Sequence, residues 1–200
     1  MRRGRMIIIV PVLLAGITIH SRSQSFELTS DSALFQVSGT STLHDWKMQL
    51  EAFDCKADFV LNGSQLRSVG NIIFQCRSTD LKSESSLMDR KAHSAMKADE
   101  NPDISFRMPS VMAVTTHSND FTDDLNGILR IAGQSKPVTI HFHGTSYERN
   151  GTVIVNIYGS TELKMSDFGI APPVLMMGAL KTGDTVKISF SLQFREKSMN

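Results

Sequence analysis

The feature that most limits the fold is an alternation of apolar and polar side chains along much of the chain. In the longest run, Val186, Ile188, Phe190, Leu192 and Phe194 alternate with polar residues. A period of two places the apolar side chains on one face of a β-strand. Similar runs recur from residue 50 onward. The sequence therefore predicts a series of half-buried strands.

Turn residues separate these runs at short distances. Asn62-Gly63-Ser64 and Gly133-Gln134-Ser135 are typical of tight connections, and Asn150-Gly151 is the strongest hairpin signal in the chain. Short connections of this kind join antiparallel neighbours. About eight strands joined in this way predict an antiparallel barrel or a sandwich in one domain.

One segment, residues 83–98, has the three-four spacing of a helix. Leu87, Met88, Ala92, Ala95 and Met96 form its apolar stripe. Three serines at positions 83, 85 and 86 are candidate caps, and the proline at position 102 prevents continuation. The prediction is an all-β fold with one short helix.

The N-terminal segment has the layout of an export signal. Arg2, Arg3 and Arg5 precede an apolar run from Met6 to Ile19, which is shorter than the roughly 20 residues that span a bilayer. We expect a signal peptide over residues 1–23, a mature domain over residues 24–200 and no membrane span after cleavage. The mature chain has 17 basic and 20 acidic side chains, a net charge of −3, which disfavours nucleic acid as a partner.

Two cysteines, Cys55 and Cys76, lie on neighbouring predicted strands. If the hairpin folds about Gln65 and Leu66, Cys55 lies opposite Cys76, at a separation close to disulfide reach. An exported chain meets an oxidising compartment, so we expect a cross-strand disulfide. Two buried free thiols are the alternative, because free cysteine packs well as a small apolar side chain.

Catalytic and metal motifs are weak in this sequence. Ser41, His44 and Asp45 are close in sequence, whereas a catalytic triad is normally assembled from distant elements, and no nucleophile elbow is present. His141 and His143 share an outward strand face without an evident third metal ligand. The sequence therefore indicates no catalytic residues, no metal and no cofactor.

The segment over residues 165–184 combines methionines with helix-breaking glycines and prolines. Such a segment either lines the mouth of a barrel as an adaptable apolar surface or plugs its end. The residues alone leave both alternatives open.

Four blocks of the chain resemble the YceI-like family of exported bacterial proteins. They are GTSTLHDWKM (39–48), LMDRKAHSAMKADENPDISF (87–106), GILRIAGQSKPVTIHFHG (127–144) and LKMSDFGIAPPVLMMGALKTGDTVKISFSLQF (163–194). The resemblance implies an extended eight-stranded antiparallel lipocalin-like barrel, located in the periplasm, whose apolar interior binds a polyisoprenoid chain, in some members a polyprenyl diphosphate or quinone.

From the aligned blocks, one set of residues is expected to form the wall or mouth of this tunnel. These ligand-binding candidates are Trp46, Met88, Met96, Phe106, Leu129, Phe142, Met165, Phe168, Ile170, Met176 and Met177. His44 and Asp45 are candidates for a polar end of the site.

Three functions are compatible with this sequence. The leading hypothesis is non-catalytic carriage or sequestration of an isoprenoid lipid. The second is a stress-related structural protein whose barrel is filled by its own side chains. The third is a hydrolase that uses His44 and Asp45. The sequence leaves the oligomeric state open between a monomer and a homodimer.

Overall fold

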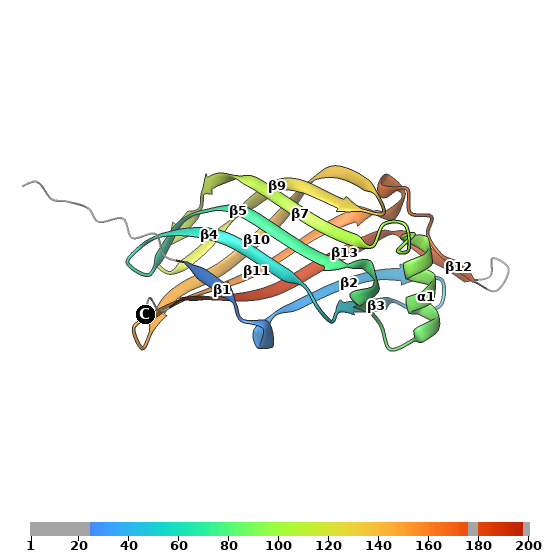
Figure 1. Cartoon of the computed structure of the whole chain (residues 1–200), viewed down its shortest axis with the longest axis horizontal. Helices are drawn as coiled ribbons and strands as arrows, with labels where there is room; N and C mark the ends of the chain where they lie inside the picture. Colours follow the sequence, from blue (N-terminus) through green and yellow to red (C-terminus); the bar gives the residue numbers. More distant parts are fainter. Residues whose placement is uncertain (1–24, 176–179, 198–200) are drawn as a thin grey trace, which may run out of the picture.

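The computed structural model describes residues 25–175 and 180–197. These residues form a long, curled antiparallel sheet with α1 (Ser86–Ala95) across one end (Figure 1). The strands are β1 (Phe26–Leu28), β2 (Leu34–Ser41), β3 (Trp46–Leu50), β4 (Asp54–Asn62), β5 (Gln65–Arg77), β6 (Leu81–Lys82), β7 (Asp103–Ala113), β8 (Thr115–His117), β9 (Asp120–Ile131), β10 (Gln134–Arg149), β11 (Thr152–Lys164), β12 (Val174–Leu175) and β13 (Leu180–Glu196). Three 3₁₀ turns complete the elements, η1 (Ser30–Ser32), η2 (Ser78–Asp80) and η3 (Met165–Phe168).

The predicted all-β antiparallel fold with one short helix is confirmed. The strand order is β4-β5-β7-β9-β10-β11-β13-β2-β3-β6. In the described residues the sheet has 13 strands where eight were expected, because five short strands pair beside eight long ones: β1 and β12 pair with β13, β8 pairs with β9, and β3 and β6 follow β2 at the edge. The predicted signal peptide lies outside the described residues and stays a prediction.

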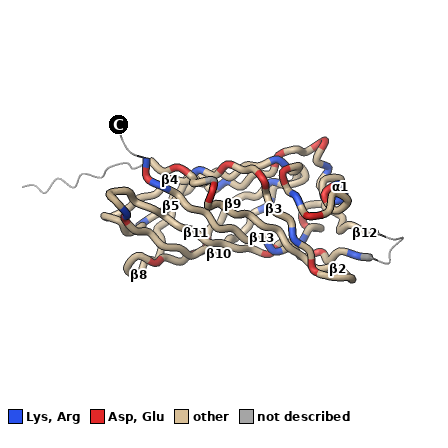
Figure 2. The backbone as a smooth tube through the Cα atoms, turned by 90° about the horizontal axis from the view of Figure 1, so that it is seen from below, with Lys and Arg blue, Asp and Glu red and all other residues tan. Residues whose placement is uncertain are grey.

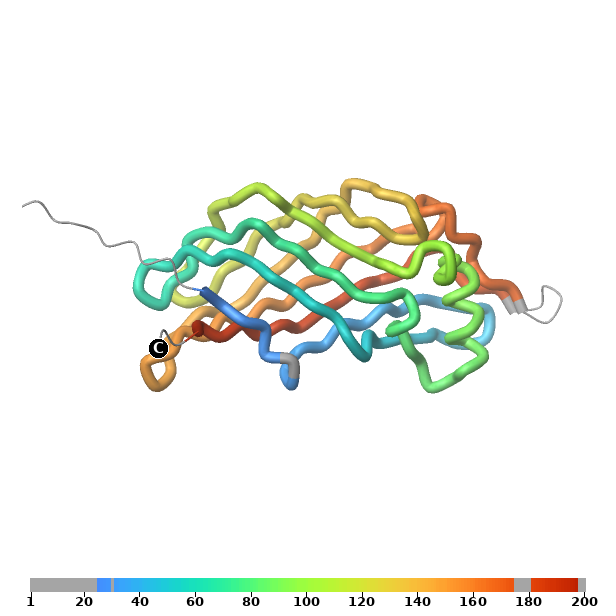
Figure 3. Tube along the Cα trace, viewed as in Figure 1, coloured from blue at the N-terminus to red at the C-terminus, as the bar shows by residue number. Residues whose placement is uncertain are grey.

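The curled sheet closes along a seam between β4 and β1 (Figures 1 and 3). Within residues 25–175 and 180–197, no ladder joins these two strands. Aromatic rings bridge the seam instead. The ring centroids of Phe26 in β1 and Phe59 in β4 are 5.2 Å apart, and beyond these two strands Phe35 of β2 stacks on Phe74 of β5 at 4.8 Å. Apolar burial therefore closes the barrel where backbone hydrogen bonds do not.

The β10–β11 hairpin forms at the predicted turn. Arg149 pairs with Thr152, which leaves Asn150 and Gly151 as a two-residue loop. Both residues have positive φ, 54° and 76°, as a turn that matches the twist of the strands requires. The Asn-Gly prediction is therefore confirmed.

The predicted register of the β4–β5 hairpin, and with it the disulfide, is wrong. The turn consists of Gly63 and Ser64, two positions earlier than expected. Register shifts in β4 then place Cys55 opposite Phe74, and Cys76 lies opposite Ile104 of β7. Both cysteines are buried free thiols, the alternative named above.

The helix is shorter than the predicted segment 83–98. The Ser85 hydroxyl caps it by accepting a hydrogen bond from the Met88 N–H at 3.4 Å. At the other end Lys97 has a positive φ of 52°, and the Lys97 and Ala98 N–H groups donate to the carbonyls of Ser94 and His93. This is a Schellman C-cap with lysine where glycine is usual, so the sequence carried no stop signal there.

Positions of both charges are spread along the strands, and both signs occur around α1 (Figure 2). Among the described residues no helix has the length and apolar character needed to cross a membrane.

Candidate lipid-binding cavity

The barrel contains a cavity of about 420 Å³ with an almost wholly apolar wall. Its deep wall includes buried side chains such as Phe74, Phe106 and Phe142. At the α1 end the wall continues onto exposed residues, because Leu43 and Leu87 line the cavity and are 71% and 48% exposed. The mouth of the cavity therefore lies at the α1 end, and its volume is in the range of small-ligand pockets, about 300–1,000 Å³.

The structure brings most of the predicted ligand-binding residues together around this cavity. Those that line it are Trp46, Met88, Met96, Phe106, Leu129, Phe142, Met165, Phe168 and Ile170. Met176 and Met177 lie outside the described residues. These nine residues line the cavity, and their role in ligand binding stays a prediction.

The segment after β11 wraps the mouth as a 3₁₀ turn. Gly169 ends η3 in the left-handed region with φ 68°, and the Ile170 N–H donates to the Met165 carbonyl. Asp184 holds the turn from β13 by accepting hydrogen bonds from the Ser166 N–H and hydroxyl at 2.8 and 2.6 Å. These hydrogen bonds from Ser166 lower the pKa of Asp184. The irregular backbone thus directs Met165, Phe168 and Ile170 to the cavity.

The expected polar end is only partly assembled at the mouth. His44 lines the cavity, whereas Asp45 is an exposed neighbour that does not. The Ser41 hydroxyl donates to the His44 carbonyl at 2.7 Å, and His44 Nδ1 lies 2.8 Å from the Asp45 carbonyl oxygen. These bonds shape the β2–β3 loop and do not pair a nucleophile with a base.

Sequence reasoning missed two lysines at the mouth. Lys91 extends from α1 and Lys164 from the end of β11, and both line the cavity. No aspartate or glutamate among the described residues lines it. Lys91 lies one turn from Leu87 and Ala95, which also line the cavity, and this four-residue spacing could have identified it.

Glycines make room for three aromatic rings of the wall. A Cβ at Gly39 would lie 2.5 Å from Trp46, and one at Gly127 would lie 2.3 Å from Phe106. The same relation holds for Gly159 and Phe190, at 2.2 Å. Glycine inside a strand often marks such a close approach, so the signal was present in the sequence.

Cys55 and Cys76 also line the cavity. Burial raises the pKa of each thiol to about 12, with a smaller contribution from Asp54 at Cys55 and from Asp80 and Asp103 at Cys76. Both sulfurs therefore stay protonated and weakly nucleophilic at neutral pH.

The two strand histidines point outward, as expected. His141 Nδ1 lies 2.5 Å from Asp124, and His143 stacks on Tyr158. In the described ranges no three histidine, cysteine, aspartate or glutamate side chains group as a metal site.

Three solved structures share this architecture. BcnA of Burkholderia cenocepacia has a TM-score of 0.61 at 15% identity, over 84% of this chain and 99% of its own. A YceI protein of Campylobacter jejuni has a TM-score of 0.56 at 16% identity, over 74% and 84%. A polyisoprenoid-binding domain from Saccharophagus degradans, described as implicated in plant cell wall breakdown, has a TM-score of 0.61 at 9% identity, over 87% and 99%. At these identities the likeness establishes the fold alone.

Sequence comparison supplies the family. No curated protein sequence matches the chain. The YceI-like domain family matches residues 18–194, which include all the cavity-lining elements. The chain belongs to the YceI-like family.

Proposed function

We propose that this protein binds an isoprenoid lipid, either a polyprenyl chain or a quinone, without chemical conversion, and carries or sequesters it in the periplasm. The observation that carries the proposal is the apolar cavity of about 420 Å³, open at the α1 end. Burial of each methylene contributes about 0.8 kcal/mol, so an apolar tail inside this wall binds without a charged anchor. The Saccharophagus degradans neighbour, described as a polyisoprenoid-binding domain, supports this class of ligand.

The polar head group would remain at the mouth. Lys91, Lys164 and His44 are the lining residues there that carry or can acquire positive charge. Deeper in the cavity the wall is apolar, and a buried head group without partners would lose several hydrogen bonds to water. The tail therefore enters first, and the head stays near α1.

The periplasmic location rests on the N-terminal residues. Three arginines before a short apolar run are typical of a secretory signal. Fusion of residues 1–23 to a reporter that is active only after export tests this part of the proposal, and cytoplasmic retention of the reporter would contradict it.

The binding proposal is tested by organic extraction and mass spectrometry of the purified protein, followed by titration with a fluorescent prenyl probe. Ala92→Trp fills the cavity from α1, because Ala92 lines it. Ser94→Trp is the matched control on the exposed side of the same helix. We expect the probe to bind the wild type and Ser94→Trp, and to bind Ala92→Trp at least roughly tenfold more weakly. A wild-type protein that yields no lipid and binds no probe would overturn the proposal.

A further inference from the structure

The interior of the barrel is hollow at one end and packed at the other. Seven buried apolar residues that do not line the cavity fill the end away from α1: Phe59, Leu66, Met108, Phe121, Val153, Val155 and Phe194. We propose that this packed end is a stop for the lipid tail, so that the protein selects its ligand by tail length. The inference rests on the proposed function and adds a selectivity to it.

Strand register places four of these seven residues at the end of the barrel away from α1. Leu66 follows the β4–β5 turn, and Val153 follows the β10–β11 turn. Val155 of β11 lies opposite Phe194 of β13, which sets Phe194 at the same level. Phe59 and Met108 border the cavity, since they lie opposite Val69 and Ile72, which line it, and we call the seven residues together the floor.

Ring contacts join floor residues to each other and to the cavity wall. The rings of Phe59 and Phe194 meet edge to face at 5.0 Å. The ring of Phe121 lies 6.0 Å from that of Phe142, which lines the cavity. A densely packed layer of this kind leaves no space for further isoprene units.

The floor is also held by a buried hydrogen bond. The Leu66 N–H donates to the Ser146 hydroxyl at 3.0 Å, and both residues are 0% exposed. This bond joins β5 to β10 across the interior. The floor is therefore part of the folded framework and not a mobile flap.

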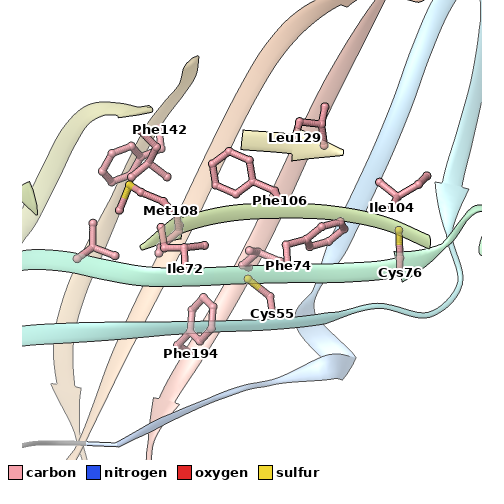
Figure 4. Packing of buried hydrophobic residues seen from close by; sticks show 14 of the residues in the cluster. Cys55, Ile72, Phe74, Cys76, Ile104, Phe106, Met108, Leu129, Phe142 and Phe194 are labelled. Carbon is pink, nitrogen blue, oxygen red and sulfur yellow. The ribbon is translucent and has the colours of Figure 1, made fainter. Parts of the chain in front are cut away.

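Met108 is the floor residue best placed to set the limit. It lies opposite Ile72, which lines the cavity, and it is 2% exposed. Figure 4 shows Met108 on the same side of the close-up as Ile72 and Phe142. Truncation of Met108 would extend the cavity away from α1. Val69 also lines the cavity beside the floor, since it pairs with Phe59, and a larger side chain there would shorten it.

Tail length should then affect binding only up to a limit. Each methylene that enters the cavity tightens binding about fourfold. Units beyond the limit stay in water outside the mouth and add nothing. The affinity of the wild type should rise with each isoprene unit and then level off.

The test measures displacement of a fluorescent prenyl probe by a series of isoprenoid alcohols with two, three, four, six and nine units. For the wild type we expect a plateau within the series. Met108→Ala should move the plateau to a longer tail, and Val69→Phe should move it to a shorter one. Val111→Ala is the matched control, because it truncates an exposed apolar residue of the same strand as Met108 that neither lines the cavity nor belongs to the floor, and it should leave the plateau unchanged.

The outcomes separate the two proposals. Affinity that keeps rising up to nine units, or plateaus that do not move in either variant, would overturn the tail stop while the binding function stands. Failure of every alcohol to displace the probe, or failure of the probe to bind, would overturn the binding function itself. If Met108→Ala does not fold, Val69→Phe still decides the question, because it adds bulk to an existing space.

Discussion

The ring of Phe190 in β13 lies directly over Gly159 of β11. The two residues are opposite each other in the ladder, and a Cβ on Gly159 would come within 2.2 Å of the Phe190 ring. Phe190 also lines the cavity. The missing side chain at position 159 thus lets the ring lie against the wall and leaves the centre of the barrel open.

Gly159→Ala should push the Phe190 ring into the cavity. Overpacking of this kind typically costs about 1–3 kcal/mol of unfolding free energy, and the lost space should also weaken binding of a prenyl probe. Chemical denaturation and probe titration measure the two effects. The double variant Gly159→Ala/Phe190→Leu should recover part of both, since the smaller side chain removes the clash. Equal losses in the single and double variants would contradict this account.

Alkaline pH should destabilise the protein through its two cavity thiols. Their pKa rises from the ordinary value of 9.0 to about 12 in the folded protein. Between these values the unfolded chain releases protons that the folded chain retains, so the unfolding free energy falls as pH rises. The double variant Cys55→Ala/Cys76→Ala should show a shallower fall between pH 9 and pH 12. Parallel curves for the two proteins would show that the thiols are not responsible.

Ser146→Ala should destabilise the packed end without changing the cavity wall. The Leu66 N–H, which donates to the Ser146 hydroxyl, would be left buried without this partner. The expected cost is about 1–3 kcal/mol of unfolding free energy. Ser135→Ala, an exposed serine on the same strand, is the control and should change stability little. Equal stability of both variants would contradict a structural role for the bond.

Lys91 and Lys164 should contribute to binding only when the head group is anionic. Exposed charge pairs contribute about 0.2–1 kcal/mol each, so Lys91→Gln/Lys164→Gln should weaken binding of farnesyl diphosphate roughly tenfold and leave farnesol unaffected. Lys187→Gln is the control, because this exposed lysine of β13 does not line the cavity. The loss should shrink at high salt. An equal loss for diphosphate and alcohol would show that the lysines act on the fold and not on the head group.

The sequence predicted the fold class because its signals are local. Alternation identified the strands, and Asn150-Gly151 fixed its hairpin because both positions accept positive φ. The predicted pairing of Cys55 with Cys76 was wrong because the strand register depends on the turn position and on bulges, which the alternation of apolar and polar residues does not encode. The turn formed at Gly63 and Ser64, and two register shifts followed along β4.

The candidate site could be predicted only in part for a similar reason. The apolar wall could be predicted from the inward strand positions and from the resemblance of the chain to the YceI-like family. The approach of Lys91 and Lys164 to one mouth depends on how α1 lies across the barrel, which the local sequence does not specify. The division between a hollow and a packed end is also a property of assembled side chains, since Phe142 and Phe194 are equally apolar in the sequence but only Phe142 lines the cavity.

That division has an evolutionary consequence. Side chains such as Phe59, Leu66 and Phe194 are buried in the framework and do not line the cavity. Mutations in the cavity wall can therefore change the shape of the cavity while the packed half preserves folding. The same separation makes the barrel a suitable starting point for engineering receptors that bind other apolar compounds.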